Sequence, residues 1–374
     1  MKSMPKKITI LHLLPNLNRG GAERICVEIL KGLDREKFSP MLLLFKETCA
    51  GAEMKAELKK AAIPVFTLHK RALLDPINFG RLLHKIKKIN PDILHTHLGG
   101  DIYGRLAGKI LKVPIIVSTE HNLNHDERKR ATWLKKITAH FANKIFAVSE
   151  AVREDAIIRY KLKPEKITVL YNGIDTSLFS PENDSNGLAS NKHQDNIIIG
   201  ALGRLSPQKG FMSLIEAVAK TKNKNYLLKI GGEGDLEGKL KKRSKELGLI
   251  NRIQLLGRVD ALNFFKQIDI FIFPSLWEGL GLAILEASAM GKPIVASKIG
   301  GVREILNEES AFLFSVGDDD AMAEQIDFVI NNLNSGEIKN KISKARQIVK
   351  EKFELKDMVI RYANWYEKLL KSDE

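Results

Sequence analysis

Short apolar runs recur along the chain, and stretches with helical spacing of apolar positions separate them. The runs of the first half are residues 8–14, 41–45, 65–68, 92–95, 115–119, 144–148 and 167–171. A second series consists of residues 197–202, 227–231, 253–256, 270–273 and 293–297. Strands that alternate with helices in this way are typical of parallel sheets covered by helices. The pattern therefore predicts an α/β protein built from two such series.

The two series predict two domains joined by a linker. Residues 176–196 contain Pro, Asn and Ser without periodicity, which is typical of an interdomain segment. The first domain would then span residues 1–175 and the second residues 197–355. Two helical patterns, near residues 337–350 and 356–370, end the chain. A length of 374 residues fits two or three domains and suffices to bury a large core.

Composition narrows the class of protein. Two cysteines, Cys26 and Cys49, are too few for a disulfide framework, and both lie in apolar stretches of the sequence. No apolar run approaches the ~18 residues that a membrane-spanning helix needs. The first run is not typical of a signal peptide, because His12 interrupts it, Pro15 ends it and no cleavage site follows. We therefore expect a cytosolic protein.

Positive charge is concentrated in the first half. Residues 1–171 contain 32 Lys and Arg against 17 Asp and Glu, which equals the whole net charge of +15, whereas residues 172–374 contain 28 of each kind. This asymmetry suggests that the first domain faces an anionic partner. Nucleic acid is the weaker candidate, because no recognition motif or aromatic-rich basic stretch accompanies the charge. We expect no nucleic-acid partner.

Residues 79–89 place part of this charge on one helical face. Apolar side chains lie at helical spacing on one side, and basic side chains repeat that spacing on the other. We interpret Arg81, Lys85 and Lys88 as candidate contacts with an anionic membrane surface. A core-facing helix with a solvated back is the alternative.

A second basic segment spans residues 128–145. Its Trp133, Ile137, Phe141 and Ile145 are four residues apart, which is the spacing of one helical face. We expect most of this stripe to lie in the core.

The stretch 273–286 joins an apolar run to a helix through a turn with two glycines. Gly279 and Gly281 lack Cβ atoms where backbone N–H groups can approach a ligand, and the helix directs its positive end there, which suits a phosphate. Glu278 in the turn and Glu286 in the helix would repel a phosphate, but carboxylates accept hydrogen bonds from sugar hydroxyls. A loop with ordinary surface glutamates is the alternative.

Two other turns suit phosphates. Residues 203–210 offer Arg204 and Lys209 at a helix start, without the G-K-[ST] of a P-loop, and two solvated cations are the alternative. Gly20 and Gly21 open the first helix of the chain. Neither turn has the G-x-G-x-x-G spacing of dinucleotide-binding proteins, which argues against a nicotinamide-dependent dehydrogenase.

Three histidines lie near the ends of predicted strands. His95 and His97 are two residues apart, so their side chains share a face, and either could line a cleft at the usual ligand side of a parallel sheet. A metal pair is conceivable there, but no third ligand of suitable spacing stands out, and we predict no metal site. His121 lies just beyond residues 115–119, where a side chain is well placed for chemistry; a structural histidine is the alternative.

Together these motifs resemble the retaining family 4 glycosyltransferases, also known as glycosyl transferases group 1. Glu278 and Glu286 match the family's E-x7-E signature, whose first carboxylate contacts the donor sugar and whose second contacts the nucleotide ribose. Arg204 and Lys209 match cations that hold the donor diphosphate, and His121 matches a histidine near the reaction centre. The resemblance covers essentially the whole chain.

The resemblance implies a set of site residues. Catalytic roles fall to His121, Glu278, Arg204 and Lys209. The donor-binding residues would be Gly20, Gly21, Gly203, Arg204, Lys209, Arg258, Val259, Glu278, Gly279, Leu280, Gly281, Leu282 and Glu286. Of these, Arg258 and Val259 would lie near the nucleotide base.

The family implies the GT-B fold, in which two Rossmann-like parallel-sheet domains face each other across a cleft. The first domain would hold the acceptor and the second the nucleotide sugar. Residues 172–175 resemble the family's domain junction. The final helix lies in residues 356–374, which would cross back to the first domain and pack Trp365 and Tyr366 against it.

The expected activity is transfer of a sugar, with retention and without a metal or other cofactor, from a UDP- or GDP-linked donor. The acidic run 318–320 lies at a predicted helix start, where it complements the helix dipole, and not where a D-x-D metal motif would lie. The charge of the first half suggests a lipid-linked glycan acceptor at the inner membrane surface. The alternatives are a soluble acceptor, or a protein that only binds nucleotide sugars or polyanions.

Overall fold

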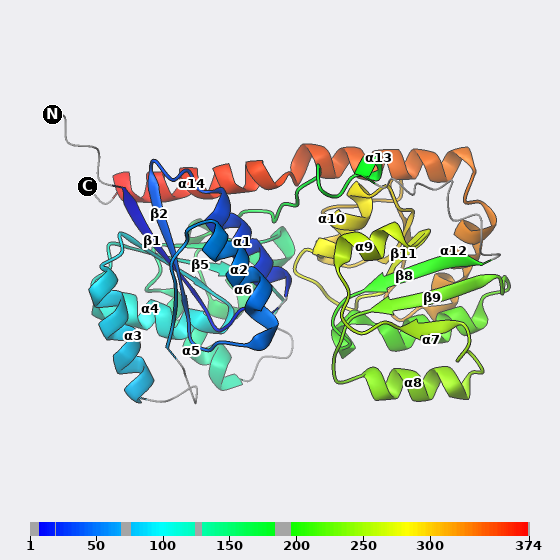
Figure 1. Ribbon diagram of the computed structural model, residues 1–374, viewed down its shortest axis with the longest axis horizontal. Coiled ribbons are helices and arrows are strands. Elements are labelled where there is room, and N and C mark those ends of the chain that lie inside the picture. The colour runs from blue at the N-terminus through cyan, green and yellow to red at the C-terminus, as the bar shows by residue number, and fades with distance from the viewer. Residues whose placement is uncertain (1–6, 19, 69–75, 124–128, 184–195, 373–374) are drawn as a thin grey trace. The chain divides into compact units, whose positions relative to one another are not determined.

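The computed structural model describes residues 7–18, 20–68, 76–123, 129–183 and 196–372. The chain divides into two compact units, the first comprising residues 1–172 and 355–374 and the second residues 173–354. Each unit contains one parallel sheet with its own helices (Figure 1). Most of the linker predicted at 176–196 lies outside the described residues, since 184–195 are not among them.

The first unit is a seven-stranded parallel sheet with strand order β3-β2-β1-β4-β5-β6-β7. Its strands are β1 (Ile8–Leu14), β2 (Phe38–Leu44), β3 (Val65–Thr67), β4 (Ile93–His97), β5 (Ile115–Glu120), β6 (Lys144–Ala147) and β7 (Ile167–Val169). Its helices are α1 (Gly21–Gly32), α2 (Ala52–Lys60), α3 (Pro76–Ile89), α4 (Asp101–Ile110), α5 (Lys129–Ala139), α6 (Glu150–Tyr160) and α14 (Leu355–Lys371).

The second unit is a six-stranded parallel sheet with strand order β10-β9-β8-β11-β12-β13. Its strands are β8 (Ile197–Leu202), β9 (Tyr226–Gly231), β10 (Ile253–Leu255), β11 (Ile270–Phe273), β12 (Ile294–Ser297) and β13 (Phe312–Phe314). Its helices are α7 (Phe211–Lys220), α8 (Glu237–Glu246), α9 (Ala261–Lys266), α10 (Leu282–Ala289), α11 (Gly300–Arg303), α12 (Asp319–Asn331) and α13 (Gly336–Lys352).

The order of strands reverses once in each sheet. In the first unit β1 pairs with both β2 and β4, and in the second β8 pairs with both β9 and β11. Crossover helices therefore leave in opposite directions from these strands. In open parallel sheets the loops at the carboxyl ends of such strands are the usual place of a ligand.

Alternation along β1 assigns its side chains to two different cores. Leu11 and Leu13 pack with Leu82 and Ile86 of α3, whose apolar face is as predicted. Leu14 instead packs with Cys26 of α1 and with α2. Because successive residues of a strand point to opposite faces, His12 lies on the same side as Leu14.

Histidines take the place of apolar residues in the middle of the first sheet. His12 and His95 are partners in register on β1 and β4, and their ring centres are 4.5 Å apart, while those of His95 and His97 are 4.1 Å apart. His95 and His97 share a face, as predicted. The expectation that they line a cleft is wrong, because both are fully buried.

The last helix covers these histidines. Tyr366 of α14 is fully buried, and its hydroxyl lies 2.7 Å from Nδ1 of His95 and 3.3 Å from Nε2 of His12. The ring of Trp365 lies 6.0 Å from that of Phe146 on β6. The end of the chain therefore packs into the first unit, as the family resemblance implied.

Burial shifts the pKa values of four histidines and one aspartate in the first unit. Desolvation lowers the pKa of His12 to about 3 and that of His121 to about 4, and it holds the pKa of His95 and His97 well below 6.5. Desolvation raises the pKa of the fully buried Asp101 to about 7, although Arg105 opposes the shift. All four histidines are therefore neutral near pH 7.

These shifts predict an acid-sensitive first unit. Below pH 6.5 the unfolded chain takes up four protons on these histidines. In the folded unit His12 and His121 take theirs up only near pH 3 and pH 4, and burial also disfavours protonation of His95 and His97. Stability is therefore fully present above pH 6.5 and is lost as the pH falls, by about 1.4 kcal/mol per pH unit for each histidine. Asp101 offsets one of the four protons, because its folded form binds a proton first.

Denaturation followed by tryptophan fluorescence at pH 7 and pH 5 measures this effect. Trp133 and Trp365 report on the first unit, whose midpoint should fall at pH 5. Trp277 reports on the second unit, which contains a single histidine, His193, and serves as the internal control. Equal shifts of both transitions would contradict the assignment to the buried histidines.

Candidate functional site

Two loops at the carboxyl ends of β8 and β11 lie in direct contact. Gly210, at the start of α7, has φ +65°, and a Cβ there would overlap the carbonyl oxygen of Pro274. The backbone N–H of Leu276 donates to the carbonyl oxygen of Gln208 at 2.8 Å, and Gln208 Nε2 donates to that of Trp277 at 3.0 Å. The turns 203–210 and 274–281 therefore form one rigid pair.

The second turn ends in an uncapped helix start. Gly281 has φ +88° and precedes α10, and no side chain caps this end. A Cβ at Gly281 would lie 3.1 Å from the ring of Phe273, which is the last residue of β11. The first backbone N–H groups of α10 are thus not satisfied by a capping side chain and suit an anion.

Lys209 and Glu278 are brought together by these turns. They form an ion pair, and Ser275 Oγ donates a hydrogen bond to the same carboxylate oxygen of Glu278 at 3.1 Å. Glu278 is only 6% exposed. Lys209 Nζ also lies 5.5 Å from the centre of the Phe273 ring. The cation and the carboxylate therefore neutralise each other.

Neighbouring loops complete this edge of the sheet. A Cβ at Gly301 of α11 would overlap the carbonyl oxygens of Gly279 and Glu278, so α11 packs directly on the second turn. The loop after β9 approaches residues 203–205 equally closely, through Gly232 and Gly234. Four loops therefore converge where the strand order reverses.

The other predicted donor-binding residues differ in how they are placed. Arg204 and Arg258 are exposed in the loops after β8 and β10, and Val259 packs beside Gly231.

The predicted residues at the start of α10 are less exposed. Leu280 is only 2% exposed, so it can offer a ligand little beyond its backbone, whereas Glu286 is half-buried on the second turn of α10. Leu282, half-buried as well, is the first residue of α10, and Gly203 lies against the stem of Lys209.

The first unit presents a glycine turn of its own. Gly20 has an extended backbone and precedes α1, which begins at Gly21 as predicted. A Cβ at Gly20 would overlap the carboxylate of Glu23, which is nearly buried in the first turn of α1. An acidic side chain thus already complements this helix start.

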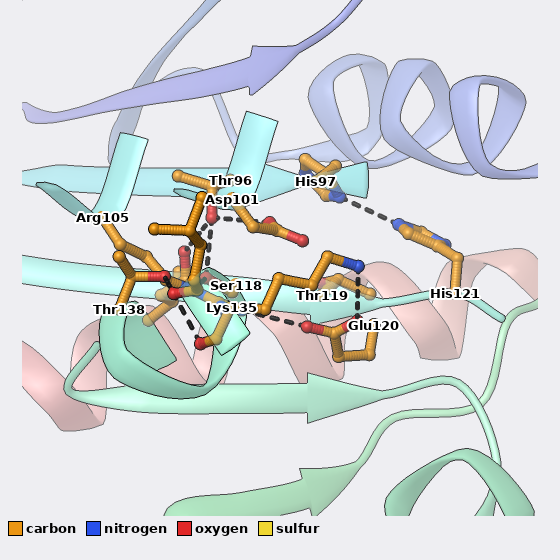
Figure 2. A network of polar contacts seen from close by, with 12 residues as sticks. Thr96, His97, Asp101, Arg105, Ser118, Thr119, Glu120, His121, Lys135 and Thr138 are labelled. Atoms are coloured by element: carbon orange, nitrogen blue, oxygen red, sulfur yellow. Dashed lines mark hydrogen bonds and ion pairs between the residues drawn. The ribbon is translucent and has the colours of Figure 1, made fainter. Parts of the chain in front are cut away.

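His121 lies directly after β5 and is 7% exposed. Its Nε2 lies 3.0 Å from Nδ1 of the buried His97 (Figure 2). Its Nδ1 is buried and has no hydrogen-bond partner among the residues that the structure describes. The ring is therefore held at one nitrogen and unpaired at the other.

A polar network occupies the opposite face of the same strands, and sequence reasoning missed it. Thr96 and Ser118 are 2.6 Å apart, Arg105 Nε donates to Ser118 Oγ at 2.7 Å, and Arg105 Nη2 contacts Glu120 Oε1 at 3.1 Å (Figure 2). Burial alone would raise the pKa of Glu120, but Lys135 and Arg105 hold it below its usual range. The sequence signal that could have revealed it is Arg105, an arginine in the stretch between the apolar runs 92–95 and 115–119.

This network also decides which face of α5 is buried. Lys135 is 7% exposed and its Nζ lies 3.9 Å from Glu120, whereas Trp133 is 60% exposed and Ile137 is 40% exposed. The predicted apolar stripe is therefore wrong at these two positions. The lysine packs inward because the buried carboxylate attracts it, and this turns the tryptophan outward.

The basic face of α3 lies at the surface. Arg81 and Lys88 are exposed, but Lys85 is half-buried, with its Nζ 3.6 Å above the ring of Phe66. Two of the three predicted membrane contacts are thus freely accessible. Among the described residues, no helix has the length and apolarity needed to cross a bilayer.

Comparison with known proteins agrees with this architecture. Residues 19–178 match the family described as Glycosyltransferase Family 4, and residues 185–348 match Glycosyl transferases group 1. The chain is 30% identical over 384 positions to the UDP-Gal:alpha-D-GlcNAc-diphosphoundecaprenol alpha-1,3-galactosyltransferase of Escherichia coli, with coverage of 96% of this chain and 98% of the relative.

Solved structures show the same fold. A glycosyltransferase of Rickettsia africae is 26% identical with a TM-score of 0.82, and the match covers 98% of this chain and 99% of the other. HepE of Anabaena in complex with UDP-glucose is 25% identical with a TM-score of 0.82, over 96% and 100% of the two chains. The chain belongs to family 4 of the glycosyltransferases, and its two parallel-sheet units are those of the GT-B fold.

Proposed function

We propose that the second unit binds the diphosphate of a nucleotide sugar at the turns 203–210 and 274–281. The observation that carries this proposal is the Lys209–Glu278 ion pair beside the uncapped start of α10. A diphosphate there meets the lysine, the exposed Arg204 and the backbone N–H groups of one helix.

Binding of the donor would exchange the partners of this ion pair. Lys209 turns from the carboxylate to the diphosphate, and Glu278 becomes free to accept hydrogen bonds from sugar hydroxyls. Because Ser275 also holds Glu278, the carboxylate keeps its place while it changes partners. Glu286 then contacts the ribose, and Arg258 and Val259 lie near the base, as the family resemblance implies.

The chemistry that follows is displacement at the anomeric carbon. The acceptor oxygen forms a bond to that carbon, the bond to the diphosphate oxygen breaks, and the acceptor proton passes to the leaving diphosphate. Attack and departure on the same face of the sugar retain its configuration. Negative charge grows on the diphosphate, where Arg204, Lys209 and the α10 start stabilise it without a metal ion. By the family resemblance, His121 would contact the donor sugar.

For the substrates we propose a UDP-linked hexose and a lipid-linked glycan acceptor. Support comes from the relative in Escherichia coli, named for a UDP-galactose donor and a diphosphoundecaprenol acceptor, and from HepE with UDP-glucose. The excess of positive charge in residues 1–171 suits the inner surface of an anionic membrane. The exposed Trp133 on the basic helix α5 adds an apolar side chain suited to such an interface.

The diphosphate assignment predicts the behaviour of Lys209→Met. The substitution keeps the stem of the side chain and removes its charge, so kcat should fall on the order of 10²–10³-fold, as on removal of one transition-state donor. Product formation from UDP-hexose and a lipid-linked acceptor is the measurement. Lys222→Met, at an exposed lysine after α7, is the matched control.

The variant leaves the nearly buried Glu278 without a cation, with only Ser275 donating to it, so stability must be measured beside activity. The double variant Lys209→Met with Glu278→Gln removes both charges and should recover any lost stability without recovering the rate. Full activity of either Lys209 variant would contradict the proposal.

The membrane assignment predicts salt-dependent binding to anionic vesicles. Each exposed Lys or Arg contributes about 1 kcal/mol near an anionic leaflet. Replacing Arg81, Lys85 and Lys88 by Ser should therefore weaken co-sedimentation with phosphatidylglycerol vesicles by on the order of 10²-fold, somewhat less if Lys85 stays on Phe66. Higher salt should weaken the binding of the unchanged protein as well.

The control replaces three exposed lysines of α8 in the second unit, Lys239, Lys242 and Lys245, by Ser. This variant has the same net charge but should bind vesicles like the unchanged protein. Equal loss in both variants would mean that charge alone matters. Binding to neutral vesicles, or no binding to any, would rule out the proposed anionic surface.

A further inference from the structure

A buried line of ring nitrogens connects the core of the first unit to His121. Sγ of Cys26 lies 3.3 Å from Nδ1 of His12, whose Nδ1 also lies 3.0 Å from Nε2 of His97. Nδ1 of His97 lies 3.0 Å from Nε2 of His121. Cys26, His12 and His97 are fully buried, so water cannot replace any of these contacts.

The line has a direction, because a neutral imidazole has one N–H donor and one bare acceptor nitrogen. Desolvation lowers the pKa of every histidine in it, so all three rings are neutral near pH 7. If Nε2 of His97 donates, its Nδ1 must accept from His121. If Nε2 of His97 accepts, its Nδ1 must donate to His121. The tautomer of His121 is thus coupled to that of His12.

The inner end of the line selects one direction. Burial raises the pKa of the Cys26 thiol well above its ordinary value, so Sγ carries a proton, and the only nitrogen near it in the described contacts is Nδ1 of His12. His12 then accepts at Nδ1, whose single lone pair faces two donors. The N–H of His97 at 3.0 Å makes the main hydrogen bond, and the weakly donating thiol at 3.3 Å shares the same lone pair. Nε2 of His12 donates to the Tyr366 hydroxyl, 3.3 Å away. Tyr366 in turn donates to His95 over 2.7 Å, a distance that suits an O–H donor.

We propose that Cys26, His12 and His97 form a positioning relay that fixes His121 as the tautomer with a proton on Nε2 and a bare Nδ1. His97 donates from Nε2 to His12, and His121 donates from Nε2 to His97. The unpaired Nδ1 of His121 is then an acceptor, ready for a hydroxyl of the ligand. This inference rests on the proposed function in one respect, that His121 contacts the donor sugar.

The same atoms also allow a different interpretation. Ligand atoms of His12, Cys26 and His97 lie within 4.8 Å of one another, which is compatible with a transition-metal site. Two nitrogens bound to one tetrahedral zinc ion at the usual Zn–N length lie about 3.3 Å apart. Nδ1 of His12 and Nε2 of His97 lie closer, at 3.0 Å, which is a hydrogen-bonding distance.

Nuclear magnetic resonance of the histidine rings tests the relay without any substrate. In protein labelled with ¹⁵N at histidine, long-range ¹H–¹⁵N correlations distinguish a protonated from a bare ring nitrogen. The signals of His121, one of nine histidines, are identified by their loss in His121→Gln. We expect a single form with Nε2 protonated and Nδ1 bare.

His97→Phe keeps a ring in the core and removes both nitrogens, so the ratio of His121 tautomers should shift about fivefold, the effect of one lost hydrogen bond. Ser118→Ala is the control. It removes buried hydrogen bonds to Thr96 and Arg105 on the opposite face of the same sheet, so the tautomer of His121 should stay unchanged. Both variants lose buried hydrogen bonds, so a merely structural effect would appear in both.

Three results would overturn the relay. They are a protonated Nδ1 on His121 in the unchanged protein, an unaltered tautomer in His97→Phe, and a thiolate-to-cobalt absorption band on adding Co²⁺ that Cys26→Ser abolishes. A different measurement tests the proposed function. Full transferase activity of His121→Gln would show that His121 does not bind the donor, and this result would not change the tautomer measured in the unchanged protein.

Discussion

The site depends on one constraint: at the carboxyl edge of the second sheet, the backbones of neighbouring loops lie in direct contact. Gly210 lies against Pro274, Gly232 against the carbonyl of Gly203, and Gly301 against that of Gly279. A side chain at any of these positions would separate two loops. Because the loops touch, Lys209 reaches Glu278, and the start of α10 faces the same space as the lysine.

The first sheet relies on a different principle, the alternation of side chains along its central strands. On one face of β4 and β5, Thr96, Ser118 and Glu120 join Arg105 in an ion-paired network. On the other face His95 and His97 meet His12, Tyr366 and His121. Burying so many polar groups is costly unless most of them are hydrogen-bonded, and these hydrogen bonds hold both faces of the sheet rigid beside His121.

Much of the fold and part of the site could be predicted from the chain itself. Apolar run lengths located the strands, and the turn glycines located the loops, because both reflect local backbone requirements. The face of α5 was predicted wrongly, since a buried carboxylate on another strand outweighed the apolar preference of Trp133. The contact between His12 and His97, 85 residues apart, required the register of β1 and β4 and had no local signal.

We propose that protein groups alone balance the charge of the donor diphosphate. Initial rates of sugar transfer from UDP-hexose to a lipid-linked acceptor, compared in excess EDTA and in excess Mg²⁺, test this proposal. If Arg204, Lys209 and the start of α10 stabilise the leaving diphosphate, the two rates are the same. A rate that EDTA abolishes and Mg²⁺ restores would contradict the account.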